Sequence, residues 1–97
     1  MVIRIIDLVS GANTADDGDA VYQALKHALG QPGQVIVCFA GIQTATSSFV
    51  NASFVRLLDD CSFSDIKTRL RVTNSTRQIN DMIKRRMTKS ALSVAAT

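Results

Sequence analysis

The chain has 97 residues, 46% of them apolar, and a formal net charge of +3. This length allows one domain and excludes a second hydrophobic core. The absence of Trp and the single Tyr argue against a surface for stacked bases. No apolar stretch is long enough to cross a bilayer, and the N-terminal run lacks the layout of a secretory signal. The sequence therefore predicts a cytoplasmic protein without membrane contact.

The charge is divided unequally along the chain. Residues 1–65 carry three basic residues against seven Asp, a net −4, whereas residues 66–97 carry eight against one Asp, a net +7. Such segregation favours an acidic or phosphorylated partner at the basic end. A solvated strand face and helix end is the simpler interpretation, and contact with the nucleic-acid backbone is another. The basic residues concerned are Arg69, Arg71, Arg77, Lys84, Arg85 and Arg86.

The N-terminal third predicts a strand, a loop and a helix. The β-branched run 2–8 is typical of a strand, and the polar residues of 10–18 are typical of a loop. Apolar residues at helical spacing follow from Val21, with Thr14 or Asp17 as the cap, and the Gly-Gln-Pro-Gly turn 30–33 ends the helix. A further short strand near residue 9 or 12 stays open.

The middle third predicts a buried strand and one long helix. Residues 35–40 are apolar without alternation, which favours a strand covered by helices on both faces. After a turn at 41–45, an apolar stripe predicts a continuous helix over 47–58. This helix ends near Asp59 and Asp60, whose charge is unfavourable at a helix C-terminus. A partner or a cap from the basic half would account for them.

The last third predicts a short connection at 63–67, a strand and a final helix. Leu70 and Val72 form one side of the strand, with Arg69 and Arg71 alternating on the other. Ser75 and Gln78 have the spacing of a capping box, which predicts the start of the last helix.

The order of elements therefore predicts an α/β domain. We expect a small mixed or mostly parallel sheet of three to five strands with helices packed on it, formed by residues 1–90. Residues 91–97 are expected to fray.

The hydroxyl-rich turn 44–48 has the most chemical content. It leaves the end of a buried strand, where ligands of open α/β sheets bind, and it opens a helix, whose free N–H groups suit an anion. Thr44, Thr46 and Ser47 are candidates for contact with an anion or a partner. Ser47 and Ser48 are candidates for phosphorylation. Simple capping of the helix by Thr44 or Thr46 is the alternative interpretation.

Residue types that support catalysis are scarce. His27 is the only His and falls in the middle of a predicted helix, so a Ser–His pair is not expected. Cys38 and Cys61 are separated in sequence and are interpreted as reduced thiols. No metal-ligand spacing and no glycine-rich phosphate loop occurs. We therefore expect no enzyme, no metal and no cofactor.

Two segments resemble a known family. Residues 39–50 (FAGIQTATSSFV) and 69–75 (RLRVTNS) are similar to the STAS-like domain family of unknown function. That family is a distant relative of the STAS domains of anti-sigma factor antagonists and sulfate transporters. The resemblance extends over about residues 16–87 and implies a STAS-like fold.

The resemblance also implies a regulatory role. In the antagonists the corresponding turn reads Asp-Ser-Ser-Gly-Leu, and a partner kinase of the GHKL ATPase type phosphorylates the first Ser, which switches binding off. Ser47 matches that Ser, and Ser48 matches the next. Thr46 replaces the Asp and so removes a charged cap, whereas Phe49 replaces the Gly and adds bulk where a partner approaches.

The expected function follows from this match. The resemblance implies a non-enzymatic protein-interaction module that Ser47 phosphorylation switches, and the short chain is compatible with a monomer or a homodimer. The implied partner is a GHKL-type ATPase or a serine kinase. Two alternatives stay open: nucleic-acid binding through the basic half, and an anion or nucleotide site where Thr46 and Ser47 begin the helix.

Overall fold

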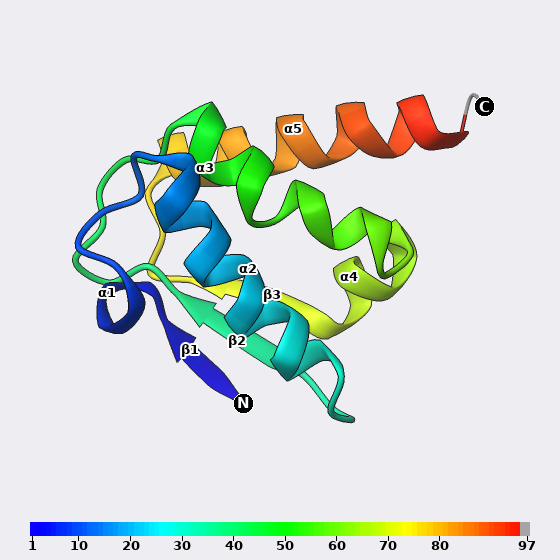
Figure 1. Cartoon of the computed structure of the whole chain (residues 1–97), viewed down its shortest axis with the longest axis horizontal. Coiled ribbons are helices and arrows are strands. Elements are labelled where there is room, and N and C mark those ends of the chain that lie inside the picture. The colour runs from blue at the N-terminus through cyan, green and yellow to red at the C-terminus, as the bar shows by residue number, and fades with distance from the viewer. Residues whose placement is uncertain (96–97) are drawn as a thin grey trace.

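The computed structural model describes the backbone of residues 1–95 and the side chains of residues 1–90 (Figure 1). Strands and helices alternate along the chain, which confirms the α/β class. The elements are β1 (Val2–Arg4), α1 (Ile5–Leu8), α2 (Ala15–Leu29), β2 (Val35–Cys38), α3 (Ser47–Ala52), the 3-10 helix η1 (Val55–Asp59), α4 (Phe63–Arg69), β3 (Leu70–Thr73) and α5 (Arg77–Ala95). The tail predicted to fray is helical up to Ala95, and residues 96–97 lie outside the described residues.

The three strands form a parallel sheet in the order β1-β2-β3. Ile3 pairs with Val37, and Val37 pairs with Val72, so that these side chains share one face. Beyond the sheet, Ala12 forms a parallel bridge with Ala45, which is the short extra pairing that the sequence left open near residue 12. The small, mostly parallel sheet is therefore confirmed.

The helices of the described chain cover one face of the sheet, and the expectation of helices on both faces is wrong. Val35 and Val37 are buried, but Ile36 and Cys38 between them are half-buried, and Val2, which pairs with Ile36, is 63% exposed. Successive right-handed crossovers in the same direction place both helical connections on the same side. Figure 1 shows α2, α3 and α5 on this side of the strands.

The core lies between the sheet and the helices. Phe39, which follows β2, stacks on Phe54 with ring centroids 6.1 Å apart, and both side chains are fully buried. Gly18 lets α2 and α3 approach closely, because a Cβ at this position would lie 2.6 Å from the Phe49 carbonyl oxygen and 2.7 Å from Ala52 Cβ. The start of α3 is therefore fixed against α2.

β1 is shorter than the predicted strand 2–8. Its last residue, Arg4, pairs with Cys38, where β2 also ends, so the chain beyond has no partner strand. It turns into α1, which buries Ile5. Gly41 has φ +87 and leaves room for Ile6, whose Cδ1 would lie 2.7 Å from a Cβ at residue 41.

The predicted helix 47–58 is divided at Ser53. Its buried hydroxyl donates to the Phe49 carbonyl at 2.7 Å, and its backbone leaves the helical region with φ −112 and ψ −80. A hydroxyl that competes for helix carbonyls bends or ends a helix. The apolar stripe continues nevertheless, since Phe54 and Leu57 are fully buried.

The predicted connection 63–67 belongs to α4, which begins after Ser62. The Ser62 hydroxyl accepts a hydrogen bond from the Asp65 N–H at 3.1 Å and caps this helix. A Ser with an Asp three residues later was the available sequence signal. Among residues 1–95 no helix combines the length and apolar content that a bilayer crossing needs.

Candidate partner-binding site at the start of α3

The hydroxyl-rich turn lies between β2 and α3, at the carboxyl end of the parallel strands. The adjacent N-terminal loop holds it from one side. Thr46 N–H donates to the Ala12 carbonyl at 3.0 Å, and the Thr46 hydroxyl donates to the Asn13 carbonyl at 2.8 Å. Because this edge is where open α/β sheets commonly bind ligands, the turn is well placed for an external contact.

Thr46 caps α3. Its hydroxyl oxygen accepts the Phe49 N–H at 3.2 Å, in addition to the hydrogen bond that it donates to Asn13. The Thr46 hydroxyl thus acts as donor and as acceptor within the fold, and its acceptor role is the one that the capping interpretation predicts.

The start of α5 holds the turn from the other side. The Gln78 side chain pairs with Ala45: Oε1 accepts the Ala45 N–H at 2.9 Å, and Nε2 donates to the Ala45 carbonyl at 3.0 Å. The Thr76 hydroxyl donates to the Gln43 carbonyl at 2.7 Å. The turn is therefore fixed between two segments that are distant in sequence.

The expected capping box at the start of α5 is wrong in its detail. Thr76, not Ser75, accepts the Ile79 N–H, at 3.3 Å. The Ser75 hydroxyl instead donates to the Asn80 side chain. The Gln78 side chain bonds to the Ala45 backbone instead. The sequence did not indicate this contact, because a Gln at that spacing locally suggests only a capping box.

The remaining hydroxyls of the turn lie toward the surface. Thr44 and Ser48 are exposed, and Ser47 is half-buried as the first residue of α3. The structure thus gathers Thr44, Ser47 and Ser48 beside the held turn. Of the two candidate phosphorylation residues, Ser48 is the more accessible.

Phe49 does not obstruct this surface. Its side chain is fully buried against the core, and its carbonyl faces Gly18 and Ser53. The expectation that Phe49 places bulk where a partner approaches is therefore wrong, because the helical phase turns this position inward. Ser48 is thus exposed on α3, whereas the neighbouring Phe49 is buried in the core.

The six predicted basic residues are divided among different parts of the molecule. Arg69 binds the end of α2: Nε donates to the Gly33 carbonyl at 3.1 Å, one terminal nitrogen donates to the Leu29 carbonyl at 3.0 Å, and the other to the Gln31 carbonyl. The prediction that Arg69 belongs to the strand is wrong, because Arg69 is the last residue of α4 and β3 begins at Leu70. The Arg69 guanidinium therefore connects α4 to the end of α2.

The other cations lie on two elements. Arg71 pairs with Ile36 in the sheet and is exposed on the uncovered face. Lys84 and Arg85 line a shallow surface along α5 with Lys89 and Asp81. Arg86 is half-buried, and Arg77 begins α5 next to Gln78, which holds the turn.

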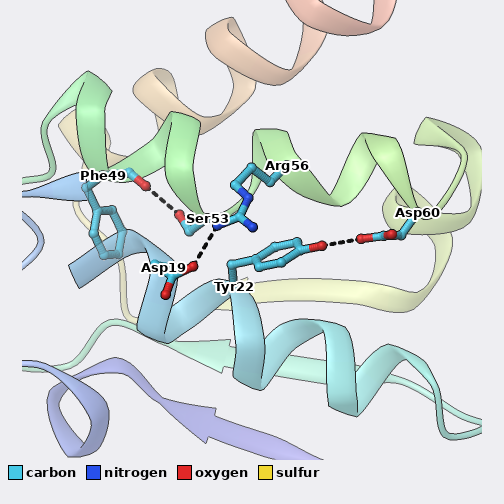
Figure 2. A network of polar contacts seen from close by, with 6 residues as sticks. All are labelled: Asp19, Tyr22, Phe49, Ser53, Arg56 and Asp60. Carbon is cyan, nitrogen blue, oxygen red and sulfur yellow. Dashed lines mark hydrogen bonds and ion pairs between the residues drawn. The ribbon is translucent and has the colours of Figure 1, made fainter. Parts of the chain in front are cut away.

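A polar network connects α2 with η1, as Figure 2 shows. The Tyr22 hydroxyl donates to the Asp60 carboxylate, and the Arg56 guanidinium lies 3.9 Å from the centre of the Tyr22 ring while it pairs with Asp19 at 2.7 Å. Lys26 Nζ lies 4.0 Å from Asp60. Asp60, at the acidic end of the predicted helix, is thus partnered by α2 and not by the basic half.

This network changes the titration of Tyr22. The hydrogen bond to Asp60 and, to a smaller degree, burial raise the pKa of Tyr22 above its ordinary value of 10.0. The hydrogen bond disfavours the phenolate because the ionised oxygen has no proton to donate and faces a carboxylate. Burial disfavours the phenolate because it removes water from the charged oxygen.

Cys38 and Cys61 are free thiols. Cys38 lies at the carboxyl end of β2, and the Asn74 side-chain amide donates to its sulfur at 3.2 Å, which lowers the pKa of the Cys38 thiol. Asn74 has φ +54, a left-handed conformation that Asn tolerates.

A comparison with protein families gives one match. The family model of the STAS-like domain of unknown function (DUF4325) matches residues 17–80, from the first turn of α2 to the first turn of α5. The matched segment therefore includes the turn, α3 and Gln78. Comparisons with curated proteins and with solved structures give no match.

Proposed function

Because this chain belongs to the STAS-like domain family, we propose that it is a non-enzymatic regulatory module that binds a partner protein through the start of α3. The contact surface comprises Thr44, Ser47 and Ser48. The partner is a GHKL-type ATPase or a serine kinase, which is the class that the resemblance implies.

The observation that carries this proposal is the way the turn is held. Ala45 and Thr46 are fixed by Gln78 on one side and by Ala12 and Asn13 on the other, while Thr44 and Ser48 stay exposed. A loop that is ordered before binding loses little conformational entropy on complex formation. Polar side chains on a rigid turn are therefore well suited to recognise a protein surface.

Ser47 is the proposed switch residue. It is the first residue of α3, so a phosphate on its hydroxyl would lie at the helix N-terminus, where negative charge is tolerated. The new charge would change the surface that the partner meets without requiring the core to move. Arg77 begins α5 beside Gln78 and offers a cation near this edge.

The position of His27 supports a non-enzymatic role. It lies exposed in the last turn of α2, which leads into the beginning of β2, whereas Ser47 follows the end of β2. The strand thus separates the only imidazole of the chain from the hydroxyls of the turn. Activation of a serine by a base requires hydrogen-bond contact between them.

The proposal is tested by incubating the chain with ATP and a purified GHKL-type ATPase, followed by intact-mass measurement and peptide mapping. We expect one phosphate on Ser47, which Ser47→Ala removes and which the control Ser64→Ala, on α4, leaves in place. If no phosphate appears and Ser47→Asp binds the ATPase like the wild type, the switch must be abandoned.

A further inference from the structure

A second surface lies away from the turn, where β3 forms an edge of the sheet. A cleft of about 520 Å³ separates this strand from α4 and the middle of α5. Its lining is mostly apolar, with Leu70 and Val72 from the strand and Ile83 and Met87 from α5. An apolar cleft beside an unpaired strand edge is typical of sites that accept an added strand.

The backbone of β3 has hydrogen-bonding groups available on this edge. The Thr73 carbonyl accepts the Phe39 N–H at 2.9 Å, so the main-chain groups of Thr73 point toward β2. Successive residues of a strand direct their N–H and C=O groups to opposite sides, so those of Val72 point to the free edge. The Leu70 N–H, which points the same way, is already bonded to the Ile66 carbonyl. Val72 is thus the residue at which an added strand would bind.

The charge of the cleft indicates what kind of strand fits. Both charged residues among the described lining are lysines, Lys67 on α4 and Lys84 on α5, and both are exposed. Beyond Lys84, the surface along α5 adds Arg85 and Lys89 against Asp81. An apolar lining that includes two cations favours an extended segment whose apolar residues are flanked at both ends by acidic ones.

We propose that this cleft binds an extended acidic segment of a partner protein, which pairs with Val72 as a fourth strand. Apolar side chains at alternate positions of that segment enter the cleft, and carboxylates at its two ends meet Lys67 and Lys84. The proposal concerns a surface distinct from the start of α3 and does not depend on phosphorylation. Ser47→Asp should leave this binding unchanged, so that the two proposals fail independently.

The test uses two fluorescein-labelled peptides that share a central Val-Thr-Val-Thr-Val segment, one flanked on both sides by glutamates and the other flanked on both sides by lysines. Fluorescence anisotropy should show the acidic peptide binding about tenfold more tightly, because two ion pairs replace two repulsions. The double variant Lys67→Glu with Lys84→Glu should reverse this preference. The control Arg4→Glu with Lys26→Glu, on β1 and α2, carries the same charge change away from the cleft and should keep the preference.

Hydrogen exchange at single amides locates the added strand. The Val72 amide should exchange more slowly when the acidic peptide is bound, since it then donates to the peptide backbone. The proposal is overturned if neither peptide binds, if charge reversal leaves the preference intact, or if Val72 stays unprotected. It is also overturned if the chain dimerises through this cleft, since the occupant is then a second copy.

Discussion

The side chain of Gln78 and the backbone of Ala45 form a closed pair of hydrogen bonds, at 2.9 and 3.0 Å. The pair resembles the hydrogen bonding between neighbouring β-strands. Ala45 thus has a strand-like partner on each side, Ala12 on one and the Gln78 side chain on the other. A single side chain thus couples the last helix to the turn that precedes α3.

Loss of this pair should destabilise the fold. Gln78→Ala leaves the buried Ala45 without partners for its N–H and C=O groups, and we expect a cost of about 1 to 3 kcal/mol in the free energy of unfolding. Urea denaturation measures this change. Gln23→Ala, an exposed Gln on α2, is the matched control and should stay within about 0.5 kcal/mol of wild type. Equal stability of the two variants would contradict the role of Gln78.

Arg69 should contribute to stability as a cap of α2. Arg69→Met removes three hydrogen bonds to the 29–33 turn but keeps most of the aliphatic stem, and we expect a loss of about 1 to 2 kcal/mol in urea denaturation. Arg71→Met removes a cation from the exposed sheet face and should have little effect. If the two variants unfold alike, Arg69 is a surface charge like Arg71.

Gly18 should resist substitution although alanine is the better helix former. A methyl group at this position would lie 2.6 Å from the Phe49 carbonyl oxygen, so α2 and α3 must separate. We expect Gly18→Ala to destabilise the chain by about 1 to 3 kcal/mol, against a gain of about 1 kcal/mol from helix propensity. A thermal denaturation midpoint at or above that of the wild type would contradict this packing.

Much of the fold could be predicted because its signals are local. The alternation of strands and helices, the cap at Thr14 and the apolar stripe of Phe49, Phe54 and Leu57 all follow from residue types and spacing. The uncovered face could not be predicted, since a run such as 35–38 is apolar whether one face or both are covered. The break at Ser53 depends on one buried hydroxyl, which looks like any polar residue in sequence.

The sequence predicted where the hydroxyl turn lies, but not the hydrogen bonds that hold it in place. The hydroxyl turn follows the buried strand as expected, and Thr46 caps α3. The contacts of Gln78, Thr76 and Asn13 join residues 33 positions apart, so no local pattern identifies them. Arg69 likewise looks like a surface cation in the sequence, but its guanidinium donates hydrogen bonds to carbonyls at the distant end of α2.

Tyr22 should titrate above its ordinary pKa of 10.0, because its hydroxyl donates to Asp60. It is the only Tyr and the chain has no Trp, so ultraviolet absorbance reports this one group. The contribution of the raised pKa to stability is complete below the unfolded value and is lost as pH rises through the folded value. Stability should therefore fall in alkaline solution, above pH 10.

Substitution of the acceptor separates this effect from general alkaline unfolding. Asp60→Asn should bring the Tyr22 midpoint back toward 10.0, since the carboxylate is the main cause of the raised pKa. Asp59→Asn, at the neighbouring exposed position, should leave the midpoint of the wild type. A midpoint that is the same in all three proteins would exclude Asp60 as the cause.

The central claim is that the chain meets its partner at the hydroxyls that begin α3. Calorimetric titration of a purified GHKL-type ATPase with wild type, Ser47→Asp and the control Ser64→Asp tests it most directly. We expect Ser47→Asp to weaken binding at least about tenfold, as a charge placed inside a protein interface commonly does, and Ser64→Asp to bind like the wild type. Equal affinities for all three chains would place the partner surface elsewhere on the molecule.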